Sequence, residues 1–200
     1  DRSKALDSNG VKVPKLEELL EIYEDKWIAD WYDNKKQREE YFTKGKEILK
    51  IFYSSQENNW TIPIALEKSF KIKVGDYLIS GKIDRIDQQK DETLEIIDYK
   101  TGKGKEKLGT DDKQQLLIYQ IAAQTLPEYK NIGEVSKLTF YYLNDDLKQS
   151  FIGKEKDIEK LQEKLLDTMN KIKEGEFKAT PGPFVCKYFE YKEICEFRKL

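Results

Sequence analysis

The sequence predicts a mixed α/β fold built on a small β-sheet, because the spacing of its apolar residues changes along the chain. Leucine and aromatic residues first recur at helical spacing over residues 16–52. From Thr61 apolar and polar residues alternate, with a hairpin-turn signal at Gly75-Asp76. A meander of three strands, a helix, more strand and a last helix complete the pattern, which indicates a sheet of few strands flanked by helices.

Two amphipathic helices are expected at the start of the chain. The first follows Pro14 and has one apolar face, which consists of Leu16, Leu19, Leu20, Tyr23, Trp27 and Trp31. The second has a face that consists of Tyr41, Gly45, Ile48, Leu49 and Phe52. These patterns predict an N-terminal helical segment over residues 1–57.

The middle of the chain is expected to form the sheet. Phe70, Ile72 and Val74 alternate with polar residues before the turn, as in a strand with one buried face. The expected strands cover residues 69–74, 77–87, 94–100 and 137–143, and residues 149–152 are expected to pair with the last of them.

Helical patterns return in the second half of the chain. A loop rich in Gly and Lys leads to a helix that Thr110 or Asp111 can cap and that Pro127 ends. A long helix follows from about Ile158 and stops near Gly175. In the aromatic and basic tail over residues 181–200, a short helix is expected over residues 190–197.

Length and composition fit one domain. With 200 residues, the chain can bury roughly 70% of the surface that its unfolded form exposes. Its 12% aromatic residues argue against disorder, although 37% of the residues are charged. We expect a single domain over residues 1–200, with a core over 61–155 and a C-terminal helix and tail over 156–200.

The absence of histidine restricts the chemistry. Without it there is no Ser-His-Asp triad, no Cys-His dyad and no histidine ligand for zinc. Acid–base or metal chemistry must then use carboxylates, Lys or Tyr, and carboxylate oxygens favour Mg²⁺ or Mn²⁺. The formal net charge is −2, from 36 basic and 38 acidic residues, so any nucleic-acid surface must be local.

Cysteine content and hydropathy predict a cytoplasmic protein without a membrane partner. Cys186 and Cys195 are the only two cysteines, which is too few for a disulfide framework. No signal peptide and no apolar run of about 18 residues is found in the sequence.

One strand pattern carries the first candidate for chemistry. Ile96, Asp98 and Lys100 share one face, because side chains at i and i+2 point the same way. A carboxylate and an ammonium group at the end of an apolar strand need a partner, a metal or solvent. A simple salt bridge at the strand end is the competing interpretation.

Two further carboxylates favour a metal site. Asp84 lies fourteen positions before Asp98 on the preceding strand, so the intervening turn can bring the two together on one face. Two close carboxylates raise each other's pKa unless a divalent cation lies between them. Glu67 on the strand before can supply a third oxygen. Three acids with Lys100 suit metal-assisted hydrolysis of a phosphodiester.

These residues stand in blocks that resemble a known family. The blocks are Glu67, Gly-Lys-Ile-Asp84-Arg-Ile-Asp, Ile-Ile-Asp98-Tyr-Lys100-Thr-Gly-Lys and Gln115-Leu-Leu-Ile-Tyr119. In this order they are similar to the PD-(D/E)XK nuclease superfamily, and within it to the RecB-like/Cas4-like branch that is often fused to UvrD-type helicases. The resemblance implies a restriction-endonuclease-like core with an N-terminal helical segment.

The resemblance also implies roles for these residues. By position, Glu67, Asp84 and Asp98 match the metal-binding acids and Lys100 matches the catalytic lysine of the family. Gln115 and Tyr119 match its Gln-x-x-x-Tyr motif, and their spacing places both on one helix face. Packing of the tyrosine beside a solvated glutamine is the alternative for that pair.

Basic residues near these blocks are candidates for binding DNA phosphates. Lys103, Lys105 and Lys107 lie in the loop after Lys100, where a solvated charge run is the alternative. Arg85 can bind phosphate or, equally, pair with Asp87 or another acid.

The implied function is that of a Mg²⁺- or Mn²⁺-dependent deoxyribonuclease domain acting on single-stranded DNA with a helicase partner in repair or recombination. Many relatives also carry an Fe–S cluster on four cysteines. Cys186 and Cys195 alone cannot complete such a site, so no Fe–S cluster is expected. A non-catalytic DNA-binding or assembly module that retains the fold is the alternative, and a carboxylate-pair glycosidase ranks below both, because it leaves Lys100 and the lysine loop without a role.

Overall fold

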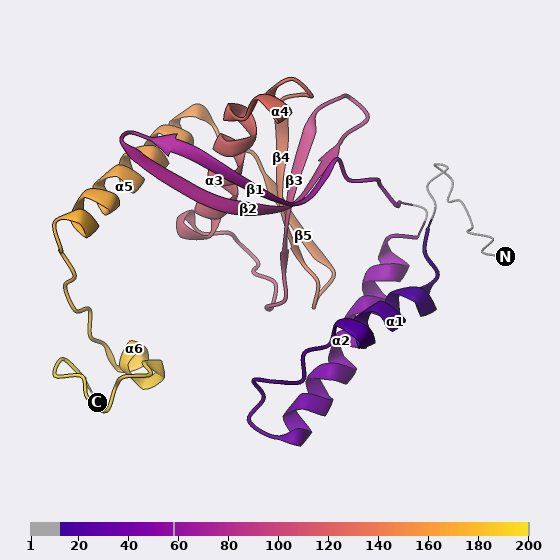
Figure 1. The fold of residues 1–200 in the computed structure, drawn as a ribbon, viewed down its shortest axis with the longest axis horizontal. Helices are drawn as coiled ribbons and strands as arrows, with labels where there is room; N and C mark the ends of the chain where they lie inside the picture. Colours follow the sequence, from indigo (N-terminus) through magenta and orange to yellow (C-terminus); the bar gives the residue numbers. More distant parts are fainter. Residues whose placement is uncertain (1–12, 58, 200) are drawn as a thin grey trace.

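A computed structural model describes residues 13–57 and 59–199 of the chain (Figure 1). Helices flank a single mixed sheet, with two helices before the first strand. The elements in chain order are α1 (Leu16–Lys26), α2 (Lys35–Ser55), β1 (Ala65–Val74), β2 (Tyr77–Gln88), β3 (Leu94–Lys100), α3 (Thr110–Thr125), α4 (Pro127–Lys130), β4 (Val135–Tyr142), β5 (Leu147–Phe151), α5 (Glu155–Lys173) and α6 (Pro183–Tyr188).

The strands are ordered β1-β2-β3-β4-β5 in the sheet. The first three strands form the expected antiparallel meander. β4 runs parallel to β3, because the chain crosses over through α3 and α4 before it returns, and β5 pairs antiparallel with β4. The predicted fold class, a small mixed sheet flanked by helices with an N-terminal helical segment, is confirmed.

The β1–β2 hairpin follows from its sequence. Gly75 has φ +59, a left-handed conformation that glycine adopts without strain, and it closes the predicted turn. Phe70, Ile72 and Val74 are buried on one face, as their alternation predicted. The hairpin extends well beyond the region where β2 pairs with β3 (Figure 1).

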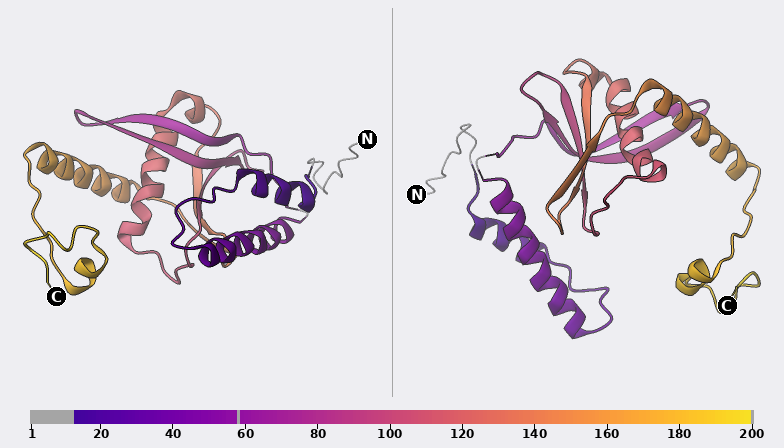
Figure 2. Two further views of the ribbon diagram at one scale, coloured as in Figure 1. Left: turned by 60° about the horizontal axis from the view of Figure 1, so that its bottom comes forward. Right: turned by 180° about the vertical axis from the view of Figure 1, so that it is seen from behind.

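The core lies between one face of the sheet and α3. Leu116 and Ala122 of α3 are fully buried against Ile86 and Ile96 of the sheet. α5 covers the same face beside α3, and its Leu161 and Leu165 join the cluster (Figure 2). α3 begins at Thr110 and ends before Pro127, as expected from the cap and proline signals.

The C-terminal end of α2 packs on the other face of the sheet. Phe52 packs against Tyr99 and Tyr141, with ring centroids 6.4 and 5.8 Å apart. Ser55 lies 3.0 Å from the Tyr141 hydroxyl, within hydrogen-bond distance. The rest of α1 and α2 projects away from the sheet as a helical hairpin (Figure 2).

Two expectations about the ends of the chain are wrong. The first helix does not reach Trp31, because α1 ends at Lys26 and Trp31 is 97% exposed with φ +77. Trp27 instead stacks on Tyr32 in the turn back to α2. In the tail, the short helix covers residues 183–188 rather than 190–197, because Pro183 fits the first turn of a helix.

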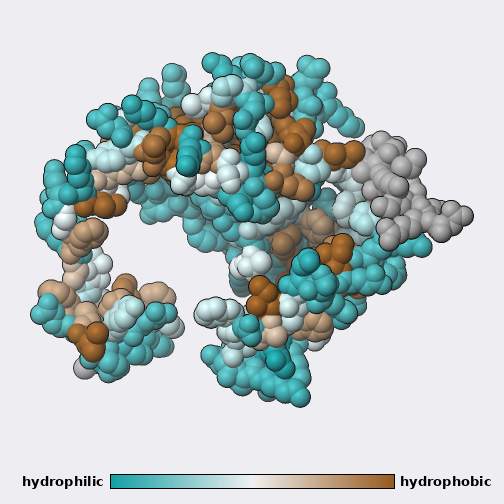
Figure 3. All heavy atoms as spheres, in the orientation of Figure 1, coloured by the Kyte–Doolittle hydropathy of each residue, from teal (hydrophilic) through white to brown (hydrophobic). Residues whose placement is uncertain are grey.

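The C-terminal tail forms a lobe of its own. Its aromatic rings contact one another in pairs, Phe184 with Tyr188 and Phe189 with Tyr191, but all four remain largely exposed. In the space-filling view this lobe and the α1–α2 hairpin project from the sheet with an open space between them (Figure 3). Among the described residues, no helix is both long and apolar enough to cross a membrane.

Candidate active site

Two neighbouring strands bring the first pair of acids together. β2 and β3 pair with Arg85 opposite Ile97 and Ile86 opposite Ile96, so one step further Asp84 lies opposite Asp98. The backbone N–H of Tyr99 donates a hydrogen bond of 3.0 Å to Asp84 Oδ2, which holds this carboxylate against β3. The short turn between the strands therefore produces the proximity that the sequence predicts.

Asp98 is the most deeply buried charged side chain of the site, at 2% exposure. Its Oδ1 accepts a hydrogen bond of 2.7 Å from Gln115 Nε2, and its Oδ2 lies 2.6 Å from Lys100 Nζ. The Lys100 side chain remains 34% exposed. The pair thus reaches from the core to the surface, with the acid inside and the ammonium group outside.

α3 supplies the residues that tie this pair together. Gln115 Oε1 accepts a hydrogen bond of 2.7 Å from Lys100 Nζ, while Gln115 Nε2 donates to Asp98 and, at 2.9 Å, to the Tyr119 hydroxyl. Gln115 and Tyr119 are one helical turn apart, so both face the sheet. The Tyr119 ring packs edge-on against Phe70 at 5.8 Å. One amide therefore orients both the acid and the lysine.

The pKa values reflect the crowding of acids. Burial raises the pKa of Asp98 above its ordinary value, and the Asp84 carboxylate raises it further, while Lys100 opposes both effects. Burial also raises the pKa of Tyr119, and the carboxylates of Asp98, Asp84 and Glu67 add to this. All three acids therefore lie within electrostatic reach of one phenol.

Glu67 is near this group but does not join it. Its backbone is left-handed, with φ +49, and its side chain is 67% exposed. The carboxylate pairs with Lys82 at 3.2 Å instead of turning toward Asp98. Accordingly, no cluster of three or more metal-ligating side chains is found in the part of the chain that the structure describes.

The predicted phosphate-binding residues divide into two sets. Arg85 lies on the opposite face of the sheet, where it pairs with Asp87 and donates to Tyr99 and Thr61. Its guanidinium group donates its hydrogen bonds within that network, so the structure agrees with pairing of Arg85 to Asp87 and not with binding of a phosphate. Lys103 and Lys107 are exposed in the loop beyond Lys100.

Lys105 of the same loop forms an ion pair with Asp112 at the start of α3. A cavity of about 380 Å³ lies beside Lys100, with Lys103, Lys105 and Gln115 in its walls. The cavity has an aromatic floor that includes Phe140, whose ring lies 5.2 Å from Lys100 Nζ. Part of the loop therefore opens directly onto the candidate site.

Two contributors to the site were missed by the sequence analysis. Phe140 lies under Lys100 because β4 pairs in parallel with β3, and no local pattern fixes the register of strands joined by a long crossover. Lys82 holds Glu67, and here a signal existed. The predicted hairpin register already places Lys82 next to the strand that carries Glu67.

Comparison with known proteins shows the family of the chain. The sequence model of the PD-(D/E)XK nuclease superfamily matches residues 8–196, and the chain belongs to this superfamily. A solved structure described as "Crystal structure of SSO0001" is similar at 18% identity, covering 92% of this chain and 95% of that chain, with a TM-score of 0.43. No curated protein matches the sequence.

Nucleases of the superfamily typically use divalent metal ions, and the donor set here fits such an ion. Asp98 Oδ2 is buried and accepts no hydrogen bond of suitable geometry from the described residues, despite the nearby Lys100. A buried carboxylate is costly unless a cation compensates it, and here the ammonium group of Lys100 lies 2.6 Å from this oxygen. Asp98 and Asp84 together offer the hard oxygen ligands that Mg²⁺ and Mn²⁺ prefer.

Proposed function

We propose that this chain is a metal-dependent deoxyribonuclease that hydrolyses the phosphodiester bonds of DNA. The observation that carries the proposal is the continuous network of Asp98, Lys100, Gln115 and Tyr119 with Asp84 beside it. Asp98 Oδ1 is bound by Gln115, whereas the buried Oδ2 meets the ammonium group of Lys100, which is itself 34% exposed, so this ion pair is open to solvent on the lysine side.

Each residue has a task in this proposal. Asp84 and Asp98 would hold a Mg²⁺ or Mn²⁺ ion, which supplies Lewis-acid polarisation of the scissile phosphate. Lys100 places a positive charge where negative charge develops on the phosphoryl oxygens. Gln115 fixes the ammonium group through its carbonyl oxygen, and Tyr119 fixes the amide in turn. Glu67 would join the metal site by releasing Lys82.

The finer assignment follows the motif order over residues 67–119. We propose that the domain is of the RecB-like/Cas4-like type, that it cuts single-stranded DNA delivered by a helicase in DNA repair or recombination, and that it works in the cytoplasm. Lys103, Lys105 and Lys107 would hold phosphates beside Lys100. We also propose that residues 1–57, 61–155 and 156–200 form the helical segment, catalytic core and C-terminal part of one domain.

The test is cleavage of end-labelled linear and circular DNA in Mn²⁺ by the wild-type chain and by Asp84→Ala. We expect the variant to lose cleavage and to keep its circular dichroism spectrum. A matched control is Asp91→Ala, which removes an exposed acid from the β2–β3 turn outside the site. Equal cleavage by wild type and Asp84→Ala contradicts the proposed role.

A second candidate is a non-catalytic module that retains the fold and binds DNA. The observation in its favour is the position of Glu67, which pairs with Lys82 and leaves two acids beside Lys100. Binding of DNA without any product at every Mn²⁺ concentration supports this candidate. Product that depends on metal excludes it.

A further inference from the structure

The outer face of the β1–β2 hairpin is lined by cations and hydroxyl groups. In the hairpin register, Ser69 pairs with Lys82, Lys71 with Ser80, and Lys73 with Leu78. Directly opposed residues share a face of the sheet, so these side chains lie together, opposite the buried face of β1. All of them are exposed to solvent. We call Lys71, Lys73, Lys82, Ser69 and Ser80 the hairpin strip.

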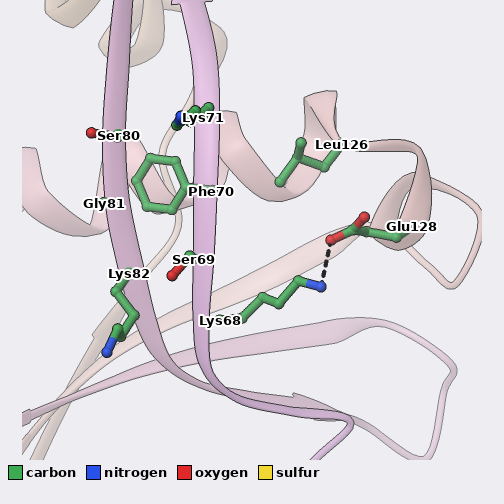
Figure 4. Close-up of a pocket in the computed structure, with 9 residues that line it drawn as sticks. All are labelled: Lys68, Ser69, Phe70, Lys71, Ser80, Gly81, Lys82, Leu126 and Glu128. Atoms are coloured by element: carbon green, nitrogen blue, oxygen red, sulfur yellow. Dashed lines mark ion pairs between the residues drawn. The ribbon is translucent and has the colours of Figure 1, made fainter.

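The lysines of the hairpin strip are available to an anion. No ion pair is found for Lys71 or Lys73 among the residues that the structure describes, and Lys82 pairs only with Glu67. By contrast, Lys68 faces the other way and forms an ion pair of 2.9 Å with Glu128 of α4 (Figure 4). Lysines on an edge strand can serve to prevent edge-to-edge pairing. Protection of the edge does not account for Lys82, because this lysine lies on β2, which is not an edge strand.

The strip borders a groove. A hollow of about 820 Å³ is lined by residues from both faces of the hairpin, which are the strip residues Lys71, Lys82, Ser69 and Ser80 and, on the side of Leu126 and Glu128, Lys68 and Phe70 (Figure 4). Gly81 lies in its wall beside the ring of Phe70. A Cβ atom at Gly81 would lie 2.6 Å from a ring atom of Phe70, so the ring packs directly against the backbone of this glycine.

The strip faces away from α3, whereas the Asp98–Lys100 pair faces it, and Glu67 is the link between them. Glu67 lies between the paired residues Leu66 and Lys68 of β1, which places it opposite Asp84 of β2. Lys82, its ion-pair partner, is the first cation of the strip. Ser69 and Lys73 are four residues apart, about 14 Å at 3.4 Å per residue.

We propose that the hairpin strip binds the phosphates of the DNA strand on one side of the scissile bond, with Lys82, Lys71 and Lys73 meeting phosphates in that order. The proposal rests on the proposed nuclease function and extends the substrate path from the active site toward the hairpin tip. Lysine side chains meet phosphates as point charges without reading sequence, so the strip adds affinity for any DNA.

The test is the salt dependence of DNA binding by Lys71→Ala/Lys73→Ala, measured by fluorescence anisotropy with a labelled single strand in EDTA. Loss of two phosphate contacts should reduce the slope of log K against log salt by about 1.4 for a single strand. Lys71→Arg/Lys73→Arg keeps the charge and should keep the slope. Lys156→Ala/Lys173→Ala removes two exposed lysines of α5 and serves as the matched control.

The outcomes separate this proposal from the proposed function, because binding is measured without metal and cleavage with Mn²⁺. A lower slope of log K against log salt in Lys71→Ala/Lys73→Ala, but not in the α5 control, supports DNA binding by the hairpin strip. This holds even if the wild-type chain does not cleave DNA and the nuclease assignment is wrong. An unchanged slope in that variant overturns the strip, even if wild type cleaves DNA. An equal loss in the α5 control, or no binding by wild type, also overturns it.

Discussion

On the face of the sheet that α3 covers, Asp98 and Lys100 form an ion pair, and on the opposite face Asp87 and Arg85 form another. Both acids are at most 6% exposed. Asp87 accepts two hydrogen bonds from Arg85 and one from Thr61, so both of its oxygens are satisfied. Asp98 keeps one buried oxygen without a hydrogen bond.

The difference separates an ion pair that hydrogen bonds close off from an ion pair that reaches solvent. A buried ion pair holds the fold only when hydrogen bonds complete it, and the Arg85–Asp87 pair meets this condition. In the Asp98–Lys100 pair, Gln115 binds both partners, but the ammonium group reaches the surface beside a cavity. The same strands therefore carry a closed network, Arg85 with Asp87, and an open network, Asp98 with Lys100, to which the proposed function assigns the chemistry.

The largest effect is expected for Lys100→Ala. Loss of its charge should lower the rate of DNA cleavage by about 10³-fold, equal to about 4 kcal/mol of transition-state stabilisation. Single-turnover cleavage in excess Mn²⁺ measures this effect. A cleavage rate within a few-fold of the wild-type rate would contradict the assignment of the chemistry to Asp98 and Lys100.

Asp87→Ala should lower the stability of the fold and leave DNA cleavage nearly unchanged. It leaves the buried Arg85 without its carboxylate, which should lower the free energy of unfolding by about 3 kcal/mol. Urea denaturation measures the loss, and cleavage per folded molecule at low temperature should stay within about threefold of wild type. A variant of normal stability that cannot cleave would reverse the comparison between the two faces.

Local periodicity accounts for much of the candidate site. Asp84 and Asp98 are neighbours because alternation fixes their face and a short turn fixes the register. Gln115 and Tyr119 share a hydrogen bond because residues one helical turn apart face the same way. In these cases the decisive contacts span a single turn or a single hairpin.

Contacts that depend on tertiary packing could not be predicted. The hairpin register indicates that Lys82 is a neighbour of Glu67, but the left-handed backbone of Glu67, whose carboxylate meets Lys82 and not Asp98, has no signal in the sequence. Whether Arg85 meets a phosphate or Asp87 depends on Thr61 and Tyr99, which complete the pocket around it. Side-chain type could indicate a charge at these positions but not its partner.

Tyr119→Phe is expected to have a smaller effect. It removes the hydroxyl that accepts from Gln115 while the ring still packs on Phe70. The loss of one hydrogen bond, about 1 kcal/mol, should lower the cleavage rate by about fivefold. If the rate falls as far as in Lys100→Ala, Tyr119 takes part in the chemistry directly.

The smallest effect concerns the pH dependence of stability, through Tyr141. Burial and Asp146 raise the pKa of Tyr141 to about 12 from its ordinary value of 10.0. The folded state therefore holds a proton that the unfolded state releases, so this contribution to stability is complete below pH 10 and is lost as pH rises through about 12. Tyr141→Phe should flatten the fall in melting temperature between pH 9 and 11, and an identical pH profile would contradict it.

The most direct measurement is calorimetric titration of Mn²⁺ into the wild-type chain, Asp98→Ala and Asp87→Ala. The account predicts binding to wild type and to Asp87→Ala, and loss of binding in Asp98→Ala. Equal binding of Mn²⁺ by all three chains, or loss of binding only in Asp87→Ala, would contradict a metal site at Asp98.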